Sequence, residues 1–327
     1  MNQPNDRRSH RDRPGALPLP GRRLLGNERM HRRRFLVFAS GGVSISLVGC
    51  SQPQTIGTSD VGAKMTRVMK VKNGGVTLPI TITGNGRKLI FFNGVGSTQA
   101  IWKQVIGKLK GQHQIITFDF RSHGAASTSA DHSFDAFESD ANCVMGAIGS
   151  GRPIVVAWSF GADLALAYAA SHPGALGGLV IVDGAVPIAK PLVEDEAGMR
   201  RSLNSPTVKL SMLLMQLTSY RYSLSGDAIA DIAVDLDARR QRLLDVYAKI
   251  DCPITMLLAT KTAGENTTEH ARRNNQIWRE GGERLAAKYP AISEQWLDSG
   301  HNLPLTKPAE LAAAIDAFAG RAVKGGL

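Results

Sequence analysis

Residues 157–161 read Ala-Trp-Ser-Phe-Gly and lie between two runs of different character. The preceding run, 154–157, is short, apolar and β-branched and predicts a buried strand, whereas the alanine- and leucine-rich run 162–168 predicts a helix. A serine on so sharp a strand-to-helix turn holds its Oγ clear of the backbone, above the amino end of the helix. The turn needs small residues two positions before and two after the serine, and the alanine and the glycine supply them. The stretch therefore predicts a nucleophile at Ser159.

Two further segments predict groups that would serve such a nucleophile. Residues 88–92 predict a strand that runs into Asn-Gly-Val-Gly-Ser at 93–97, whose two glycines leave the backbone free to turn the Val95 N–H inward. Far downstream, a strand over 294–298 leads through Ser-Gly to His301 and then into a carboxyl-terminal helix. A histidine side chain is the commonest general base, so His301 is a candidate for that role.

Taken in the order in which they occur along the chain, these segments resemble the α/β-hydrolase family over about residues 88–320. Residues 157–161 resemble the nucleophile elbow of that family, and residues 93–97 resemble its oxyanion turn, with Asn93 in place of the usual histidine. The resemblance implies an α/β fold with a mostly parallel, doubly wound sheet and a helical cap. It also implies a Ser159–His301–acid triad that works without a cofactor.

A further motif also resembles the family, where its role is structural. Residues 119–124 read Asp-Phe-Arg-Ser-His-Gly and are similar to the Asp-x-Arg-Gly-His-Gly of the family. There the Asp–Arg pair holds the loop after the strand, so we expect Asp119 and Arg121 to pair. We interpret His123 as a loop residue and not as a ligand.

The acid of the expected triad is open between two carboxylates. In most of the family the acid follows the strand before the last, and that frame places Thr262 at its position, with Glu265 three residues later. A minority of the fold supplies the acid from an earlier strand, here at Asp183. Either loop could reach His301, because the requirement is a buried carboxylate that accepts a hydrogen bond from one ring nitrogen. We favour Asp183.

The resemblance to carboxylesterases and cofactor-free haloperoxidases implies hydrolysis of a carboxylic ester of a small acyl substrate. The N–H groups of Val95 and Phe160 would stabilise the oxyanion, and Asn93, Gly94 and Trp158 would line the substrate pocket. Perhydrolysis, or cleavage of an amide or C–C bond, remains open on the same site. A lipid-anchored binding protein on a decayed hydrolase scaffold also remains open, because Thr262 replaces the usual acid and Asn93 replaces the usual histidine of the oxyanion turn.

The amino-terminal residues resemble an export signal. Residues 31–36, His-Arg-Arg-Arg-Phe-Leu, are similar to a twin-arginine motif, and the apolar stretch that follows is too short to span a bilayer. Leu-Val-Gly-Cys at 47–50 matches the bacterial lipobox, which implies a diacylglyceryl group on the Cys50 thiol. We therefore expect export to the bacterial cell envelope and attachment to a membrane through lipidated Cys50.

The charge and the motif inventory exclude several classes of function. The formal net charge of +11 falls to +4 without residues 1–49, because 29 basic and 25 acidic residues remain. The basic character therefore belongs mostly to the signal, and nucleic acid is a poor partner. No P-loop or dinucleotide-binding motif follows a strand, and the histidines show no metal-ligand spacing, so we expect no metal and no cofactor.

These assignments divide the chain into four parts. We expect an extension and signal over 1–49, a polar tether over 50–63, a hydrolase core over 64–185 and 251–327, and a helical cap over 186–250. The cap has apolar residues at helical spacing that would form its own core or line an acyl pocket, among them Leu210, Leu213, Leu214 and Leu217. Cys143 and Cys252 would form one disulfide or remain two buried thiols.

Overall fold

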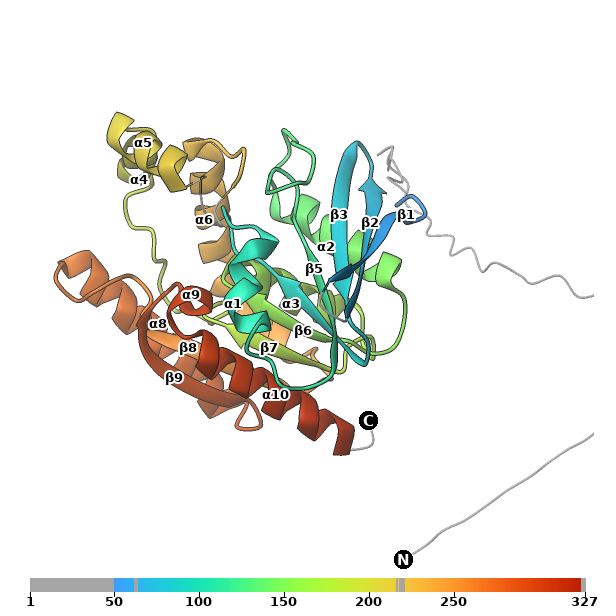
Figure 1. Cartoon of the computed structure of the whole chain (residues 1–327). Coiled ribbons are helices and arrows are strands. Elements are labelled where there is room, and N and C mark those ends of the chain that lie inside the picture. The colour runs from blue at the N-terminus through green and yellow to red at the C-terminus, as the bar shows by residue number, and fades with distance from the viewer. Residues whose placement is uncertain (1–49, 62–63, 216, 218–220, 325–327) are drawn as a thin grey trace, which may run out of the picture. The chain divides into compact units, whose positions relative to one another are not determined.

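The structure is a computed structural model that describes residues 50–61, 64–215, 217 and 221–324. The predicted extension and signal, residues 1–49, lie outside the described residues. In the described part of the chain one sheet of nine strands runs in the order β1-β2-β3-β5-β4-β6-β7-β8-β9 (Figure 1). The strands are β1 (Gln54–Val61), β2 (Lys64–Asn73), β3 (Val76–Thr83), β4 (Arg87–Phe92), β5 (His113–Phe118), β6 (Ile154–Trp158), β7 (Gly178–Val182), β8 (Ile254–Lys261) and β9 (Ser293–Gly300).

Helices cover both faces of this sheet (Figure 1). They are η1 (Gln99–Trp102), α1 (Lys103–Ile106), α2 (Phe134–Ile148), α3 (Phe160–Ser171), α4 (Glu196–Leu203), α5 (Pro206–Met215), α6 (Gly226–Arg240), α7 (Leu243–Tyr247), α8 (Glu269–Lys288), α9 (Leu303–Thr306) and α10 (Pro308–Lys324). Strands β4 to β9 pair in parallel, and β1 to β3 add an antiparallel edge. The predicted fold class, a doubly wound parallel sheet with helices inserted between β7 and β8, is confirmed.

Strand β4 shows why both faces need helices. Its side chains alternate: Ile90 and Phe92 join the core beneath α2 and α3, while Leu89 and Phe91 join the core beneath α10. All four side chains are fully buried. A strand that is apolar on both faces is typical of the centre of a parallel sheet, where two layers of helix exclude water.

The amino-terminal edge differs from the predicted tether. Residues 54–61 form β1, which pairs antiparallel with β2, so the prediction of a tether is wrong over this range. The described side chains from Ser51 to Thr58 are all exposed. A strand with exposed side chains on both faces lacks the alternating apolar pattern that reveals strands in a sequence.

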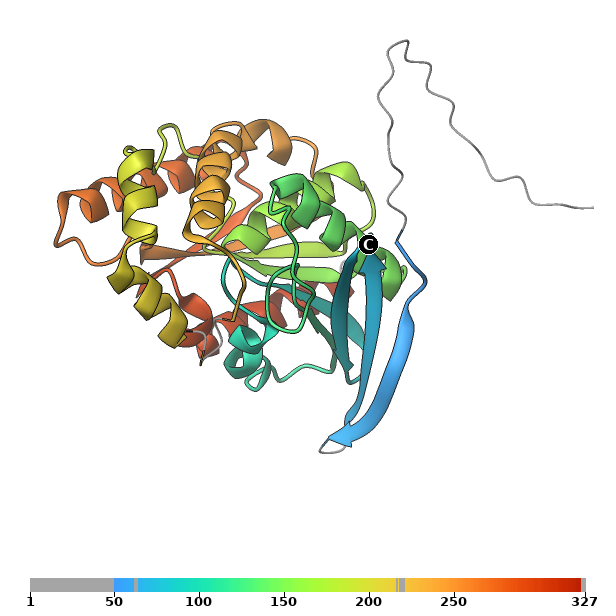
Figure 2. The ribbon, with the colours of Figure 1, turned by 90° about the horizontal axis from the view of Figure 1, so that it is seen from above.

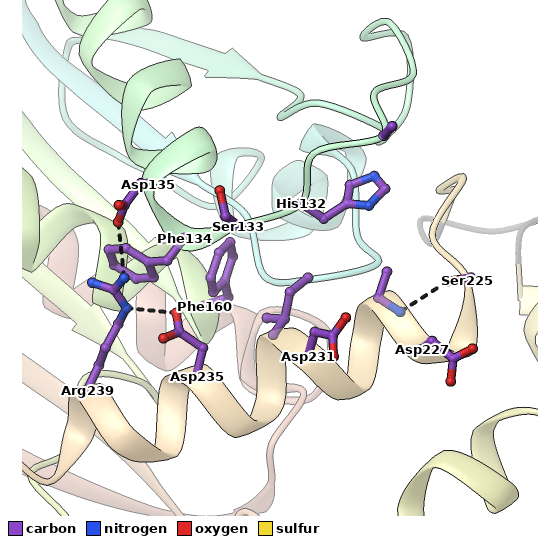
Figure 3. Close-up of a pocket in the computed structure, with 13 residues that line it drawn as sticks. His132, Ser133, Phe134, Asp135, Phe160, Ser225, Asp227, Asp231, Asp235 and Arg239 are labelled. Atoms are coloured by element: carbon purple, nitrogen blue, oxygen red, sulfur yellow. Dashed lines mark hydrogen bonds and ion pairs between the residues drawn. The ribbon is translucent and has the colours of Figure 1, made fainter. Parts of the chain in front are cut away.

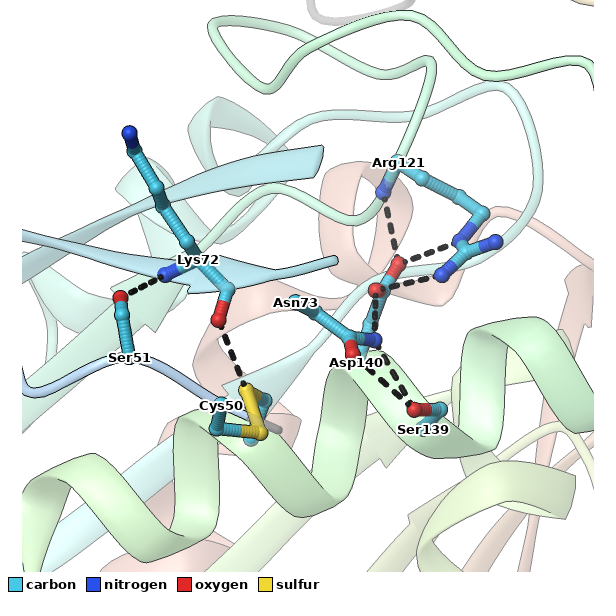
Figure 4. The surroundings of a disulfide bond; sticks show 8 residues. Cys50, Ser51, Lys72, Asn73, Arg121, Ser139 and Asp140 are labelled. Atoms are coloured by element: carbon cyan, nitrogen blue, oxygen red, sulfur yellow. Dashed lines mark hydrogen bonds and ion pairs between the residues drawn. A yellow bond between two sulfur atoms is a disulfide. The ribbon is translucent and has the colours of Figure 1, made fainter. Parts of the chain in front are cut away.

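A disulfide joins this edge to α2. Cys50 bonds Cys143, with the two Cα atoms 5.7 Å apart, next to a hydrogen bond that links Asn73 to Asp140 (Figure 4). A sulfur atom in a disulfide cannot also carry a thioether, so this disulfide and the predicted lipidation of Cys50 exclude each other, and the lipidation stays a prediction. The disulfide contradicts both predictions for Cys143. The remaining cysteine, Cys252, is a buried free thiol, and burial raises its pKa to about 11, which makes it unreactive.

The cap contains a second departure from the sequence prediction. Helix α6 buries Ile232 and Leu236 against the core, as an amphipathic cap helix should. Helix α5, in contrast, lies next to α4 at the outer edge of the cap (Figure 1). Its leucines were expected to be buried in the cap, but Leu213 and Leu214 are each 59% exposed. The prediction fails because helical spacing shows only that side chains share a face, not that another element covers it.

Candidate active site

The turn between β6 and α3 holds Ser159 in a strained conformation. Its φ of 56° and ψ of −127° lie outside the regions that residues with a Cβ normally occupy. The close approach of the neighbouring chain explains why small residues flank it: a Cβ added to Gly161 would lie 2.5 Å from the carbonyl oxygen of Asn93. A backbone hydrogen bond from the Ser159 N–H to the Val182 carbonyl fixes the turn on β7. The packing of this turn therefore projects the serine hydroxyl away from the sheet.

His301 follows β9 and meets this serine. Its Nε2 lies 2.8 Å from Ser159 Oγ, and its Nδ1 lies 2.7 Å from Asp183 Oδ2. A carboxylate can only accept, so Nδ1 carries the proton and donates to Asp183. Nε2 is thereby left to accept the hydroxyl proton of Ser159. Three of the residues singled out in the sequence thus form one hydrogen-bonded chain.

Asp183 is fully buried at the end of β7, and its carboxylate accepts four hydrogen bonds. Oδ1 accepts from the Ala259 N–H and from Trp278 Nε1, both at 2.9 Å. Oδ2 accepts from Thr262 Oγ1 at 2.8 Å as well as from His301. A buried charge needs such partners to offset its lost hydration. The four donors hold the carboxylate in one orientation toward the histidine.

The alternative acid, Glu265, does not reach the histidine. Its side chain is 70% exposed and forms an ion pair with Lys261 at 3.3 Å. Thr262, at the position where most of the family carries its acid, instead donates to Asp183 and lies 3.2 Å from His301 Nδ1. Neither Thr262 nor Trp278 could be assigned a function from the sequence. Only their position around Asp183 reveals their roles.

The oxyanion turn at 93–97 lies directly against the serine. A Cβ added to Gly94 would meet Ser159 Cβ at 3.0 Å, so glycine lets the two segments touch. The side chain of Asn93 is 1% exposed; it donates to the Phe118 carbonyl and accepts from Trp102 Nε1. Asn93 therefore fixes the turn from behind, and neither Asn93 nor Gly94 is among the residues that line the pocket beside Ser159.

Trp158 also supports the site from behind. It is 3% exposed, and its Nε1 donates to the His301 carbonyl at 2.9 Å. Against the prediction, Trp158 does not line the pocket beside Ser159. As a residue of β6, Trp158 points toward the α10 face of the sheet and anchors the loop that carries the histidine.

A comparison with protein families identifies the fold. The model of the Alpha/beta hydrolase family matches residues 89–314. The chain belongs to the α/β-hydrolase family.

Individual relatives of this α/β hydrolase are distant. It is 27% identical over 130 residues to a 2-(acetamidomethylene)succinate hydrolase of Mesorhizobium japonicum, covering 39% of this chain and 45% of that protein. It is 32% identical over 59 residues to a 3-oxoadipate enol-lactonase of Acinetobacter baylyi, covering 17% and 22%. The chain thus spans less than half the length of these relatives. An esterase structure from Exiguobacterium antarcticum superposes with a TM-score of 0.58 at 16% identity, covering 75% of this chain and 96% of that one, and shows the shared fold.

His123 of this hydrolase has a structural role that the sequence only partly indicated. It is buried, and its Nε2 accepts from the Gly96 N–H of the oxyanion turn at 2.8 Å. Its Nδ1 therefore carries the proton and donates to the Arg121 carbonyl. Burial lowers the pKa of His123 to about 4, which keeps it neutral. The expected Asp119–Arg121 pair is not the one formed, because Arg121 pairs with Asp140 of α2 at 2.8 Å (Figure 4).

Ser159 and His301 open into a pocket of about 260 Å³ between α6, α8 and the oxyanion turn. Its apolar wall comes mostly from the cap and α8, and consists of Val95, Phe160, Leu192, Ile229, Ile232, Ala233, Leu236 and Trp278. Among the described residues that line it, the only arginine or lysine is Arg240, whose Nε and Nη2 bond both oxygens of Asp163. The pocket is therefore apolar, and its cation already has a buried counter-ion.

A larger groove of about 600 Å³ lies beside this pocket, between α6 and the segment before α2 (Figure 3). Phe160 and Ile232 line both cavities. Asp231 and Asp235 line the groove, and Arg239 pairs with Asp235 at 2.7 Å. The catalytic side chains do not line it, so the smaller pocket is the candidate active site. In the described part of the chain, no group of three or more potential ligands is placed to hold a metal ion.

Proposed function

We propose that this hydrolase cleaves a carboxylic ester, or a closely related acyl bond, of a small substrate. The single observation that carries the proposal is the hydrogen-bonded chain from Ser159 Oγ through His301 to Asp183, with distances of 2.8 and 2.7 Å. A hydroxyl, an imidazole in the correct tautomer and a buried carboxylate are the parts that nucleophilic acyl transfer requires.

The proposed reaction proceeds through an acyl-enzyme. Ser159 Oγ attacks the carbonyl carbon while His301 Nε2 accepts its proton, and the carbonyl oxygen becomes an oxyanion. The N–H groups of Val95 and Phe160 would stabilise it, at roughly 3–4 kcal/mol per donor. Phe160 begins α3, so its N–H has no partner within the helix. The histidine then protonates the leaving alcohol, and a water activated by the same nitrogen releases the carboxylic acid.

The pocket favours a neutral acyl group over one that carries a carboxylate. Its wall is apolar, and the guanidinium of Arg240 is already bound on two nitrogens by Asp163. A second carboxylate on the substrate would therefore lose its hydration without gaining a dedicated partner. The substrate class differs in this respect from the succinate derivative in the name of the Mesorhizobium relative.

A decayed binding protein is a weaker alternative. It was motivated by the missing acid at position 262 and by the asparagine at position 93. Asp183 stands where an acid is required, and Asn93 is held in the core by two hydrogen bonds. Neither replacement therefore removes a part of the proposed machinery.

We propose further that the enzyme works outside the cytoplasm. The twin-arginine-like residues 31–36 support export, and the disulfide between Cys50 and Cys143 supports an oxidising compartment. Attachment through a lipid on Cys50 is not part of this proposal, because the disulfide uses that sulfur.

Ester hydrolysis and fluorophosphonate labelling test the proposed function. Wild-type protein should hydrolyse p-nitrophenyl butyrate and take up the probe, whereas Ser159→Ala and His301→Ala should do neither and keep their thermal stability. The p-nitrophenyl monoester of succinic acid is a matched charged substrate, and its kcat/KM should be at least about tenfold lower. Labelling of Ser159→Ala to the wild-type level would show that another residue is the nucleophile.

A further inference from the structure

Helix α5 and the residues just beyond it present leucines to solvent. Leu210 is 58% exposed, Leu213 and Leu214 are each 59% exposed, and Leu217 just beyond the helix is 83% exposed. Four large apolar side chains within eight residues make an exposed cluster that a protein surface rarely carries without a function. We call these four residues the leucine cluster. Nothing in the catalytic mechanism uses it.

The chain segment that carries the leucine cluster has charges of one sign, although its Arg200 pairs with Glu196, Asp227 and Asp231 just outside it. The thirty residues from 197 to 226 contain no aspartate or glutamate. The exposed cations in this range include Arg201, Lys209 and Arg221. Arg201 has only a distant partner, with 3.7 Å between it and Asp195. An apolar helix in a chain segment whose own charges are all cations is typical of segments that bind an anionic lipid surface, because the leucines enter the acyl boundary while the cations meet the phosphates.

The segment after the leucine cluster is anchored beside the catalytic site. The Arg221 carbonyl accepts from the Gly124 N–H at 2.8 Å, and the Ser223 N–H donates to the Ser122 carbonyl at 2.7 Å. The ring of Tyr222 packs on the oxyanion turn, since a Cβ added at Gly96 would meet it at 3.1 Å. A surface bound by α5 would therefore lie on the side of the molecule where the cap meets the active site.

We propose that the leucine cluster docks the enzyme on an anionic phospholipid bilayer. The helix would lie in the interface and not cross it, because α5 has ten residues. Within the described residues, no helix combines the length and apolarity needed to cross a bilayer. The leucines and the cations together select this occupant: a second copy of the chain would bring the same basic flanks against themselves. The proposal does not depend on the reaction that Ser159 performs.

Co-sedimentation of the full chain with lipid vesicles tests the proposal. The vesicles contain phosphatidylcholine alone or with 30% phosphatidylglycerol. The double variant Leu213→Ser with Leu214→Ser should bind the anionic vesicles at least about tenfold more weakly than wild type. Lys209→Glu should weaken binding to anionic vesicles and leave binding to neutral vesicles within twofold.

The matched control replaces two equally exposed apolar residues at the sheet edge, Ile56→Ser with Met65→Ser, which are 56% and 67% exposed in wild type. It should bind like wild type. Every protein keeps the same amino-terminal segment, so the comparison isolates α5. All variants should retain hydrolysis of a soluble ester, because none of these side chains touches the active site.

Two results would overturn the proposal. The first is vesicle binding by the leucine variant within twofold of wild type, or equal losses in the control variant. The second is a concentration-dependent dimer in sedimentation velocity that needs the leucines, without any leucine-dependent binding to vesicles.

Discussion

Replacing Asp183 by asparagine is the sharpest perturbation of the proposed mechanism. All four partners of the carboxylate are donors: two on Oδ1, from Ala259 and Trp278, and two on Oδ2, from Thr262 and His301. An amide has one acceptor oxygen and one NH₂ group that can only donate. The NH₂ group must therefore face one of these two pairs of donors.

The structure predicts which pair it will face. The Ala259 N–H belongs to the backbone and Trp278 is buried, so neither can turn away from Oδ1. The Thr262 hydroxyl can rotate, and His301 can exchange its proton from Nδ1 to Nε2. The amide nitrogen therefore takes the Oδ2 position and forces the tautomer in which Nε2 carries the proton and cannot act as the base. We expect kcat to fall by about four orders of magnitude, or about 5.4 kcal/mol in the activation barrier.

Steady-state hydrolysis of p-nitrophenyl butyrate measures this loss, and Glu265→Gln is the matched control because it also exchanges a carboxylate for an amide. That variant should remain within a few-fold of wild type, since Glu265 is 70% exposed and pairs only with solvent-accessible Lys261. Wild-type kcat in Asp183→Asn, or a comparable loss in Glu265→Gln, would refute the assignment of the acid.

Three further predictions concern Thr262, His123 and the disulfide of Cys50. Thr262→Asp placed in the Asp183→Asn protein should raise kcat at least about tenfold, because Thr262 Oγ1 already lies 3.2 Å from the histidine nitrogen that needs a carboxylate; no gain would mean that position 262 cannot orient the base. Burial lowers the pKa of His123 from 6.5 to about 4. As the pH falls, the unfolded chain therefore binds a proton at this histidine before the folded protein does. The free energy of unfolding should fall by about 3 kcal/mol as the pH drops from 6.5 to 4. Urea denaturation should show a smaller fall in His123→Gln, and equal falls would contradict this cause. Non-reducing mass spectrometry of the exported protein should find Cys50 joined to Cys143 and no acyl group, whereas a lipid-modified Cys50 with two alkylated thiols would reverse the assignment.

The sequence predicted the parts of the site that depend on local backbone geometry. Ser159 could be recognised because a strand, a sharp turn and a helix follow each other within residues 154–168. His301 could be recognised from its place after a strand. The choice between Asp183 and Glu265 could not be settled in the same way, because it depends on which of two loops bends toward the histidine. That bend is set by contacts with Ala259 and Trp278.

The predictions that Asn93 and Trp158 line the pocket have a different cause. Asn93 and Trp158 are neighbours of catalytic groups in the sequence, and sequence proximity suggested that they touch the substrate. On a strand, however, successive side chains point to opposite faces, so a neighbour of a catalytic residue often supports it from the other side. The predicted burial of the α5 leucines was wrong for a related reason. Its leucines are regularly spaced, but the spacing does not show whether anything covers them.

The ends of β7 and β8 explain how the acid can stand on an unusual strand. The two strands pair in parallel, and the Asp183 N–H donates to the Leu257 carbonyl while the Ala259 N–H donates to the Asp183 carboxylate. The carboxylate at the end of β7 therefore lies over the end of β8, at the place that a side chain from position 262 also reaches. Two positions 79 residues apart in the sequence converge on one nitrogen of His301. With an acid at 183, position 262 needs only a donor that fits against it, and threonine supplies that donor. The absence of a carboxylate at 262 is thus the counterpart of the acid at 183 and does not indicate a site that has lost its function.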